Sequence, residues 1–117
     1  MPGTVPHALI DAPTLTRRLY ALNTTPGLSD SGLQILLLLA HVDGELRAKQ
    51  IQDELVLEQS RVSHLLAALT AAGFVSWTVS PTHSRHRSYR LAEDGSAIVM
   101  RFVPRALREL GLSRSGL

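Results

Sequence analysis

The sequence predicts a mainly α-helical domain that carries one small β-hairpin. Up to Gly73, apolar residues recur at helical spacing in short segments that turn residues separate. After Gly73 the period changes to two: Val75, Trp77 and Val79 alternate with polar residues, which is typical of a half-buried strand. A helical pattern returns after Glu93. This order of elements predicts the α+β class.

Length and composition favour one globular domain. With 117 residues, of which 44% are hydrophobic and 19% charged, the chain is long enough for a single core. Residues 1–12 contain two prolines and a glycine, and we expect them to form a flexible tail. The domain itself is then expected to span residues 13–117.

The first helix of this domain is expected to begin at Asp11, a good N-cap, with Pro13 in its first turn. One of its faces carries three leucines at helical spacing: Leu15, Leu19 and Leu22. The segment Thr24–Gly27 ends it. The next helix is expected over residues 30–41, and it is apolar on nearly all sides, so we place it at the buried centre.

Three helices in the middle of the chain are expected to begin in the same way. A leucine precedes each N-cap, and an apolar residue follows that leucine by five positions, as in a hydrophobic staple. The pairs are Leu28 with Leu33, Leu46 with Ile51, and Leu57 with Val62. The N-caps between them are Ser29, Arg47 and Glu58. Only the serine is a good capping residue.

The remaining elements are expected at residues 48–56 and 59–72 (helices) and at 75–79 and 88–91 (strands). Gly73 stands where a left-handed residue would end the second of these helices. The last helix is expected to begin near Glu93. Pro104 is expected to kink or restart it, because proline removes a hydrogen bond and clashes one turn back.

Several classes of protein are disfavoured by what the sequence lacks. Without cysteine, the chain has no disulfide, thiolate metal site or thiol redox chemistry. Its start shows no signal-peptide pattern, and the apolar run Leu36–Ala40 is far shorter than the ~20 residues that cross a bilayer. We therefore expect a cytoplasmic protein without membrane contact. No nucleophile elbow, phosphate loop or metal-ligand cluster is present, so neither an enzyme nor a cofactor is expected.

A metal ion is not predicted either. His83 and His86 have a spacing that suits a metal, but no carboxylate or thiolate lies near them in the sequence. Metal sites in proteins need more than two such ligands as a rule. A solvated pair of histidines is therefore the favoured interpretation.

The distribution of charge is more informative than the net charge of +2. No acidic residue lies between Glu58 and Glu93, whereas this interval contains arginines and histidines. They are Arg61, Arg85, Arg87, Arg90, His64, His83 and His86. An anion-facing patch in the second half of the chain is one interpretation, and a solvated basic surface is the other.

Two short helices that are joined by a tight turn and followed by a hairpin describe a winged helix-turn-helix. In that geometry the second helix lies in the major groove of DNA, with its N-terminal residues toward the base edges. The candidate residues on that helix are Gln59, Ser60, Arg61, Ser63 and His64. Arg61 can form a bidentate pair with guanine, which gives about 1–3 kcal/mol of discrimination. An ordinary solvated arginine is the alternative.

Backbone contacts are expected from two other places. At the hairpin, or wing, Arg85, His86 and Arg87 can contact phosphates or enter the minor groove. Arg47 and Lys49, at the start of the first helix of the pair, are candidates for further contacts with the DNA backbone. Such contacts set the affinity and its salt dependence.

The stretch from Leu28 to Gly95 resembles the MarR group of bacterial winged-helix regulators. The matching runs, after the leucine-rich helix, are Leu46–Leu55, Ser60–Val75 and Tyr89–Gly95. The resemblance implies a homodimer that binds a roughly palindromic operator on double-stranded DNA and usually represses transcription. The family's recognition positions map onto the candidate residues of the second helix, and its wing arginine maps onto Arg85.

The same resemblance implies a dimer interface formed by the N- and C-terminal helices. The expected contact residues are Leu15, Leu19, Leu22, Phe102, Leu107 and Leu110. The apolar faces of these helices fit this role independently, because a lone terminal helix with such a face needs a partner. Both terminal segments are short and Pro104 interrupts the last one. The pocket in which family members bind phenolic effectors is therefore expected to be reduced or absent, and no small-molecule effector is predicted.

A sequence-specific transcriptional regulator is the favoured function. One alternative keeps DNA binding but assigns it a structural, partition or replication role, with many weak sites in place of one operator. The other is a winged helix that binds a protein and has no affinity for DNA.

Overall fold

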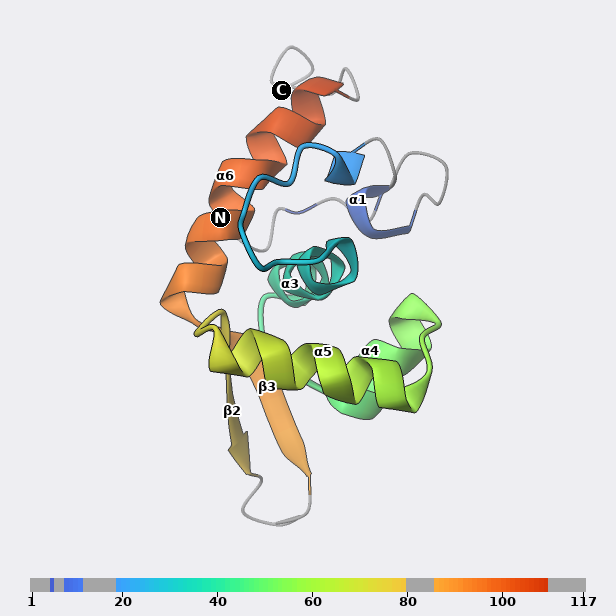
Figure 1. The fold of residues 1–117 in the computed structure, drawn as a ribbon. Helices are drawn as coiled ribbons and strands as arrows, with labels where there is room; N and C mark the ends of the chain where they lie inside the picture. Colours follow the sequence, from blue (N-terminus) through green and yellow to red (C-terminus); the bar gives the residue numbers. More distant parts are fainter. Residues whose placement is uncertain (1–4, 6–7, 12–18, 80–85, 110–117) are drawn as a thin grey trace.

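The structure is a computed structural model of the chain, and it describes residues 5, 8–11, 19–79 and 86–109. Its helices are α1 (Ala8–Asp11), α3 (Asp30–Val42), α4 (Ala48–Leu55), α5 (Gln59–Ala71) and α6 (Glu93–Glu109). Its strands are β1 (Leu46–Arg47), β2 (Val75–Val79) and β3 (Arg87–Leu91). The predicted class, mainly helical with a small hairpin, is confirmed (Figure 1).

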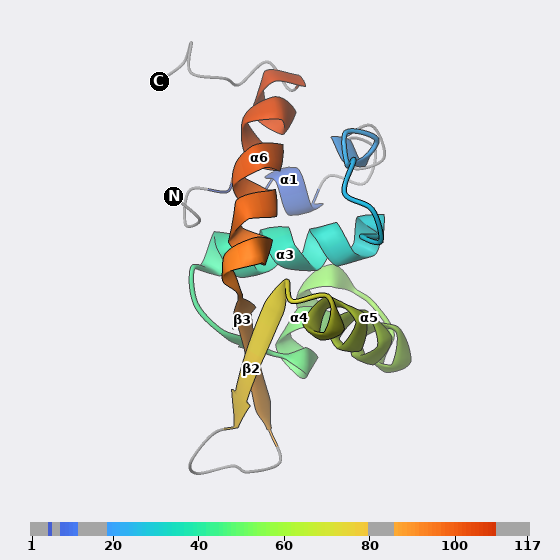
Figure 2. The same ribbon diagram turned by 60° about the vertical axis from the view of Figure 1, so that its left-hand side comes forward.

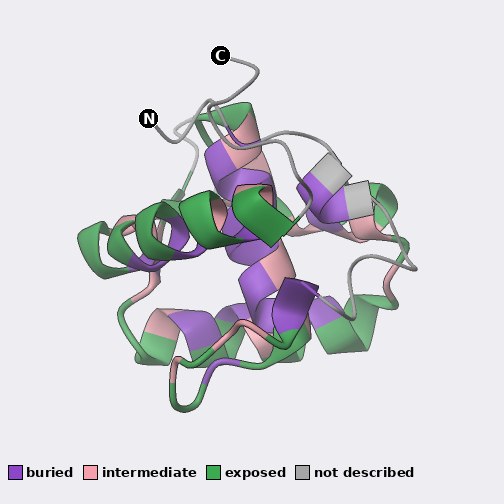
Figure 3. Cartoon of the chain, turned by 90° about the horizontal axis from the view of Figure 1, so that it is seen from above, coloured by how far each residue is buried: buried purple, intermediate pink, exposed green. Residues whose placement is uncertain are grey.

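Helix α3 forms the centre of the fold because it is apolar on nearly every side. Its residues from Ile35 to Ala40 are each at most 1% exposed. Helices α1, α5 and α6 and strand β3 all contact it (Figure 2). Ser29 caps it as predicted, since the Ser29 Oγ accepts a hydrogen bond from the Gly32 N–H at 3.0 Å. In Figure 3, buried residues run along this central helix, while the surrounding helices expose their outer faces.

The sheet has the strand order β1-β3-β2, and both pairs are antiparallel. Strands β2 and β3 form the predicted hairpin, with Val75 opposite Leu91 and Trp77 opposite Tyr89. Strand β1 is not in the predicted set: Leu46 pairs with Tyr89, although the sequence assigns it only to the start of a helix. A strand of 2 residues is too short to show an alternating pattern.

Helices α4 and α5 begin and end close to the predicted residues. Arg47 and Glu58 are their N-caps, and neither side chain caps its helix. At α4 the Gln50 side chain instead accepts a hydrogen bond from the Arg47 N–H at 2.8 Å. The turn between the helices contains Val56 in the left-handed region (φ 54°), and Gly73 adopts φ 83° after α5, as predicted.

Helix α6 runs through Pro104 as one helix, where a kink or restart was expected. Proline leaves the carbonyl of Met100 without its helical donor, but both residues are exposed, so water can bind that carbonyl. At its other end, Gly95 packs beneath the Phe74 carbonyl so closely that a Cβ on Gly95 would clash with it. The Ala92 N–H donates to the same oxygen at 3.0 Å. These contacts fix α6 against the link between α5 and β2.

Residues 8–11 form helix α1, where the sequence predicts part of a flexible tail. Leu9 and Ile10 are buried, at 0% and 3% exposure, because α1 packs on α3. The Tyr20 hydroxyl donates to the Leu9 carbonyl and the Gln34 amide donates to the Ile10 carbonyl, both at 3.1 Å. A helix of 4 residues is too short to reveal its periodicity in the sequence.

The helix predicted to follow α1 lies mostly outside the described residues, which resume at Leu19. Leu19 and Tyr20 are helical and buried. The Tyr20 ring packs against Phe102 of α6, with the ring centroids 6.0 Å apart, so this segment is held against α6. Among the described residues, no helix has both the length and the hydropathy of a membrane span.

Candidate nucleic-acid interface

Helix α5 buries one side and exposes the other, as its pattern predicts. Val62, Leu66 and Leu69 are buried, and α5 packs on α3 and α4. The candidate recognition residues are all exposed: Gln59, Ser60, Arg61, Ser63 and His64. The N-terminal half of α5 therefore presents hydrogen-bonding side chains to solvent on a rigid support.

Arg61 contacts a residue that the sequence did not indicate. Its Nη2 donates a hydrogen bond to the Ser31 Oγ, in the first turn of α3, at 2.9 Å. The bond is exposed and uses one of the five guanidinium donors. Because the bond is single and exposed, water competes for it, whereas a bidentate guanine contact gives about 1–3 kcal/mol of discrimination. Arg61 can therefore exchange Ser31 for a base.

At the wing, the structure places two of the three candidate residues, since Arg85 lies outside the described part of the chain. The Arg47 Nη1 lies 3.1 Å from the His86 Nδ1. Because a guanidinium only donates, the imidazole nitrogen accepts, and this contact requires an unprotonated Nδ1. Arg87 is exposed, and its guanidinium carbon lies 3.9 Å from the centre of the Trp77 ring.

Two ion pairs lie near these cations. The Lys49 Nζ is 3.2 Å from the Asp53 Oδ1, one turn along α4, and both side chains are mostly exposed. Arg90 Nη1 is 3.9 Å from Glu45 Oε2. Exposed pairs of this kind contribute roughly 0–1 kcal/mol, so they do not prevent these cations from binding phosphate.

The space between α4, α5 and the hairpin is hollowed. One hollow of about 460 Å³ is lined by Arg47, Ala48, Lys49, His86, Arg87 and Tyr89. A second hollow of about 460 Å³ is lined by Ala48, Ser63, Leu66, Ala67, Thr70, Ala71, Trp77, Arg87 and Tyr89. Because the two share Ala48, Arg87 and Tyr89, we describe them together as the wing groove. Among the described residues, its lining contains cations, the aromatic rings of Trp77 and Tyr89, and hydroxyls, but no carboxylate.

Sequence reasoning missed two residues of this region. Ser31 was missed because no local pattern links it to Arg61, 30 residues away. Trp77 was expected only as one apolar residue of a half-buried strand, and in the structure its side chain is exposed. The sequence did contain a signal for its contact with Arg87. Trp77 is a large aromatic residue in a strand that several arginines follow, and such a ring can stack on an arginine.

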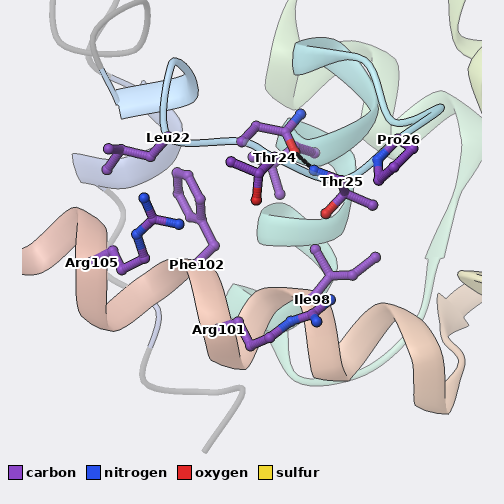
Figure 4. A pocket seen from close by; sticks show the side chains of 10 residues that line it. Leu22, Thr24, Thr25, Pro26, Ile98, Arg101, Phe102 and Arg105 are labelled. Carbon is purple, nitrogen blue, oxygen red and sulfur yellow. Dashed lines mark hydrogen bonds between the residues drawn. The ribbon is translucent and has the colours of Figure 1, made fainter.

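A separate hollow of about 200 Å³ lies between the segment after Tyr20 and helix α6 (Figure 4). Its lining is Leu22, Asn23, Thr24, Thr25, Pro26, Leu33, Ile98, Arg101, Phe102 and Arg105. Small-molecule sites usually measure about 300–1,000 Å³. The hollow is thus below the usual size of an effector site.

The predicted dimer residues have different positions. Leu19 and Phe102 are buried in the core of this chain, and Leu22 and Leu107 are half-buried against it. Leu15 and Leu110 lie outside the described residues. A large apolar side chain of α6 that is exposed is instead Met100, at 57%.

In the described part of the chain, no three histidine, aspartate or glutamate side chains come together as a metal site would require. His86 lies within that part, and His83 lies outside it. His86 contacts Arg47, a cation.

Comparison with known proteins identifies the central segment. Residues 30–78 match the family model of the IclR helix-turn-helix domain. The match begins at α3, contains α4 and α5, and ends within β2. Among curated proteins, no sequence matches.

Solved structures extend the likeness beyond that segment. A transcriptional regulator from Thermotoga maritima has a TM-score of 0.70 at 18% identity, over 89% of this chain and 72% of its own. AbsC, a MarR family transcriptional regulator from Streptomyces coelicolor, has a TM-score of 0.71 at 22% identity, over 82% of this chain and 66% of its own. A mutant MarR from E. coli, solved with operator DNA, has a TM-score of 0.60 at 18% identity, over 75% of this chain and 59% of its own.

These likenesses agree with the order of elements in the structure. Helices α4 and α5 and the turn between them are the helix-turn-helix, and the β2–β3 hairpin is its wing. The chain has the winged helix-turn-helix fold of the MarR-family transcriptional regulators.

Proposed function

We propose that this protein is a sequence-specific transcriptional regulator that binds a roughly palindromic operator as a homodimer and represses transcription. The observation that carries the proposal is the exposed polar surface of α5 beside the wing groove, whose lining, as far as the structure describes it, holds cations and no carboxylate. A duplex carries one negative charge per ~1.7 Å of its axis, so such a surface is complementary to it.

In this proposal, α5 reads the bases and the surrounding cations hold the backbone. Arg61, Ser63 and His64 face the major groove, where Arg61 binds a guanine edge. Arg47 and Lys49 on α4 and Arg87 on the wing contact phosphates on either side. The E. coli MarR that shares the fold was solved with operator DNA, which supports DNA binding by analogy.

Dimerisation is proposed through the outer face of α6. Met100 is 57% exposed, and Val103 and Leu107 are half-buried beside the core. The buried Leu19 and Phe102 would support this face from beneath and would not contact the partner. A two-fold dimer places its recognition helices one turn of DNA apart, about 34–36 Å, which predicts two half-sites in an inverted repeat.

The test is binding of the purified protein to DNA from the region upstream of its own gene, at two salt concentrations and with excess competitor DNA. Saturable binding that survives competition supports a regulator. Salt-sensitive binding that competitor DNA abolishes favours the structural DNA-binding role. No binding at either salt concentration contradicts DNA binding and favours a protein-binding winged helix.

Sedimentation equilibrium with Met100→Glu tests the dimer. The substitution places an unpaired carboxylate in the proposed interface, so we expect the variant to be a monomer. We also expect it to have a much lower affinity for an operator with two half-sites. Glu93→Gln, at the far end of the same helix, is the control and should remain a dimer. A Met100→Glu variant that sediments like the wild type would contradict the proposed interface.

A further inference from the structure

The stack of Arg87 on Trp77 lies where the two halves of the wing groove meet. Trp77 on β2 faces Tyr89 on β3, and Val79 faces Arg87, so Trp77 and Arg87 are diagonal neighbours across the hairpin. Their 3.9 Å separation is well within the range of a cation–π contact. Arg87 lines both hollows of the groove, and Trp77 lines the one beside α5.

Trp77 is 37% exposed, although it is the single tryptophan of the chain and a large apolar group. One face of its ring is used by the guanidinium of Arg87. Among the residues that the structure describes, no carboxylate pairs with Arg87, so its in-plane N–H donors are available to another acceptor. A stacked guanidinium is also restricted to few rotamers, which orders its donors before a ligand arrives.

The wing groove matches the chemistry of a sugar–phosphate backbone. When α5 lies in the major groove and the wing reaches the adjacent minor groove, one DNA strand passes between them. The groove lies between these elements, with Ala67 and Ala71 leaving room on the α5 side and Ser63 offering a hydroxyl. Arg47 and Lys49 extend its positive charge toward α4.

We propose that the wing groove seats one backbone strand of duplex DNA, and that Trp77 is a positioning residue that holds Arg87 against a phosphate of that strand. This inference rests on the proposed function and adds to it a residue that acts through Arg87.

The first experiment examines the stack in the free protein. Trp77 is the only source of tryptophan fluorescence, so its quenching by acrylamide reports its exposure directly. Arg87→Ala should increase quenching because it uncovers the ring. Arg90→Ala is the control, because it removes a cation from the strand pair next to Trp77 and leaves the stack intact, and it should not change the quenching. Equal quenching in all three proteins would contradict the stack.

The second experiment measures the affinity for the upstream DNA against salt concentration, using the wild type, Trp77→Leu, Trp77→Phe, Arg87→Ala and the double variant Trp77→Leu/Arg87→Ala. Arg87→Ala should lower the slope of log affinity against log salt by about 1.8, because the proposed dimer loses one phosphate contact in each protomer and each contact contributes about 0.9. Trp77→Leu should also lower the slope. It should lower the affinity by about two- to fivefold for each protomer, which is the equivalent of an exposed cation–π contact. Trp77→Phe should recover most of the loss.

The double variant decides whether Trp77 acts through Arg87. We expect it to bind like Arg87→Ala alone, because Trp77 has nothing left to position. Losses that multiply, or a Trp77→Leu slope equal to that of the wild type, would overturn the inference while DNA binding stands. Thr78→Ala, exposed on the opposite face of β2, is the matched control, and thermal unfolding confirms that each variant folds. A wild type that does not bind DNA would overturn the proposed function together with this inference.

Discussion

Arg61, on the helix proposed to read the bases, donates a hydrogen bond to Ser31, in the first turn of the central helix, at 2.9 Å. The free protein therefore holds the side chain of Arg61 at the surface of α3. The bond is single and exposed, so a bidentate contact with a base would be able to replace it. Ser31 would then order Arg61 without blocking it.

Ser31→Ala tests this relationship. We expect the free energy of unfolding to fall by less than about 1 kcal/mol, because an exposed hydrogen bond contributes little. Operator affinity should stay within a few-fold of the wild type, whereas Arg61→Ala should lose discrimination. A tenfold or greater loss of affinity in Ser31→Ala would mean that the bond persists in the complex. Titration by fluorescence anisotropy measures both variants.

Gly95→Ala should be strongly destabilising. The new methyl would meet the backbone carbonyl of Phe74, which cannot move without disturbing the start of α6. Overpacking of this kind costs about 1–3 kcal/mol or more. Gly44→Ala is the control: its Cβ would meet nothing closer than 3.8 Å. Urea unfolding should separate the two, and equal midpoints would show that the contact at Gly95 is looser than described.

Val56→Gly should stabilise the protein. Val56 is 87% exposed and has φ 54°, a conformation that β-branched residues avoid by roughly 1–2 kcal/mol. Part of that gain is offset by the larger unfolded-state entropy of glycine, so we expect a net gain of about 0.5–1 kcal/mol. Asp43→Gly, at the same φ, should gain less because aspartate tolerates this region. A destabilised Val56→Gly would show that the valine makes a contact that offsets its strain.

Tyr20→Phe should change the response of stability to alkaline pH. Burial, with a smaller contribution from the Asp30 carboxylate, raises the pKa of Tyr20 well above its ordinary value. The folded protein therefore keeps the phenol neutral, whereas in the unfolded chain it ionises near pH 10. Stability from this group is fully present below about pH 10 and falls above it by up to 1.4 kcal/mol per pH unit.

The variant lacks the hydrogen bond to the Leu9 carbonyl, so it should be less stable than the wild type at pH 8, by about 0.5–1.5 kcal/mol. Above pH 10 the difference should shrink, because only the wild type has this ionisation to suppress. Urea unfolding at several pH values measures both curves. Parallel curves up to pH 11 would mean that Tyr20 ionises as freely in the fold as in the unfolded chain.

The elements with strong periodicity were predictable from the sequence. The all-round apolarity of α3 and the stripe of Val62, Leu66 and Leu69 on α5 both reflect burial. In β2 the expected alternation is not seen in the burial, because Val75 is buried whereas Trp77 and Val79 are exposed. Helix α1 and strand β1 were not predictable from the sequence. With 4 and 2 residues respectively, they are too short to show a period, and tertiary contacts determine their conformation. Leu9, for example, is buried by α3 and bonded by Tyr20, which follows it by 11 residues.

The candidate site likewise has features that the sequence predicts and features that it does not. Exposure of Gln59, Ser60 and Arg61 follows from the buried stripe of their own helix, so the sequence was sufficient to place them. The contacts of Arg61 with Ser31 and of Arg87 with Trp77 depend on how distant segments pack. Pro104 shows the limit of a local rule, because solvent exposure lets α6 continue as one helix where the sequence predicts a kink or a restart.

The most direct test of the account is a footprint on the DNA upstream of the gene, made with the wild type and with Arg61→Ala at equal protein concentration. The account predicts that the wild type protects two half-sites about one helical turn apart, and that Arg61→Ala loses this protection while retaining salt-sensitive binding to any duplex. The same footprint in both proteins would contradict base reading by Arg61 on α5. No footprint with the wild type would contradict the regulator itself.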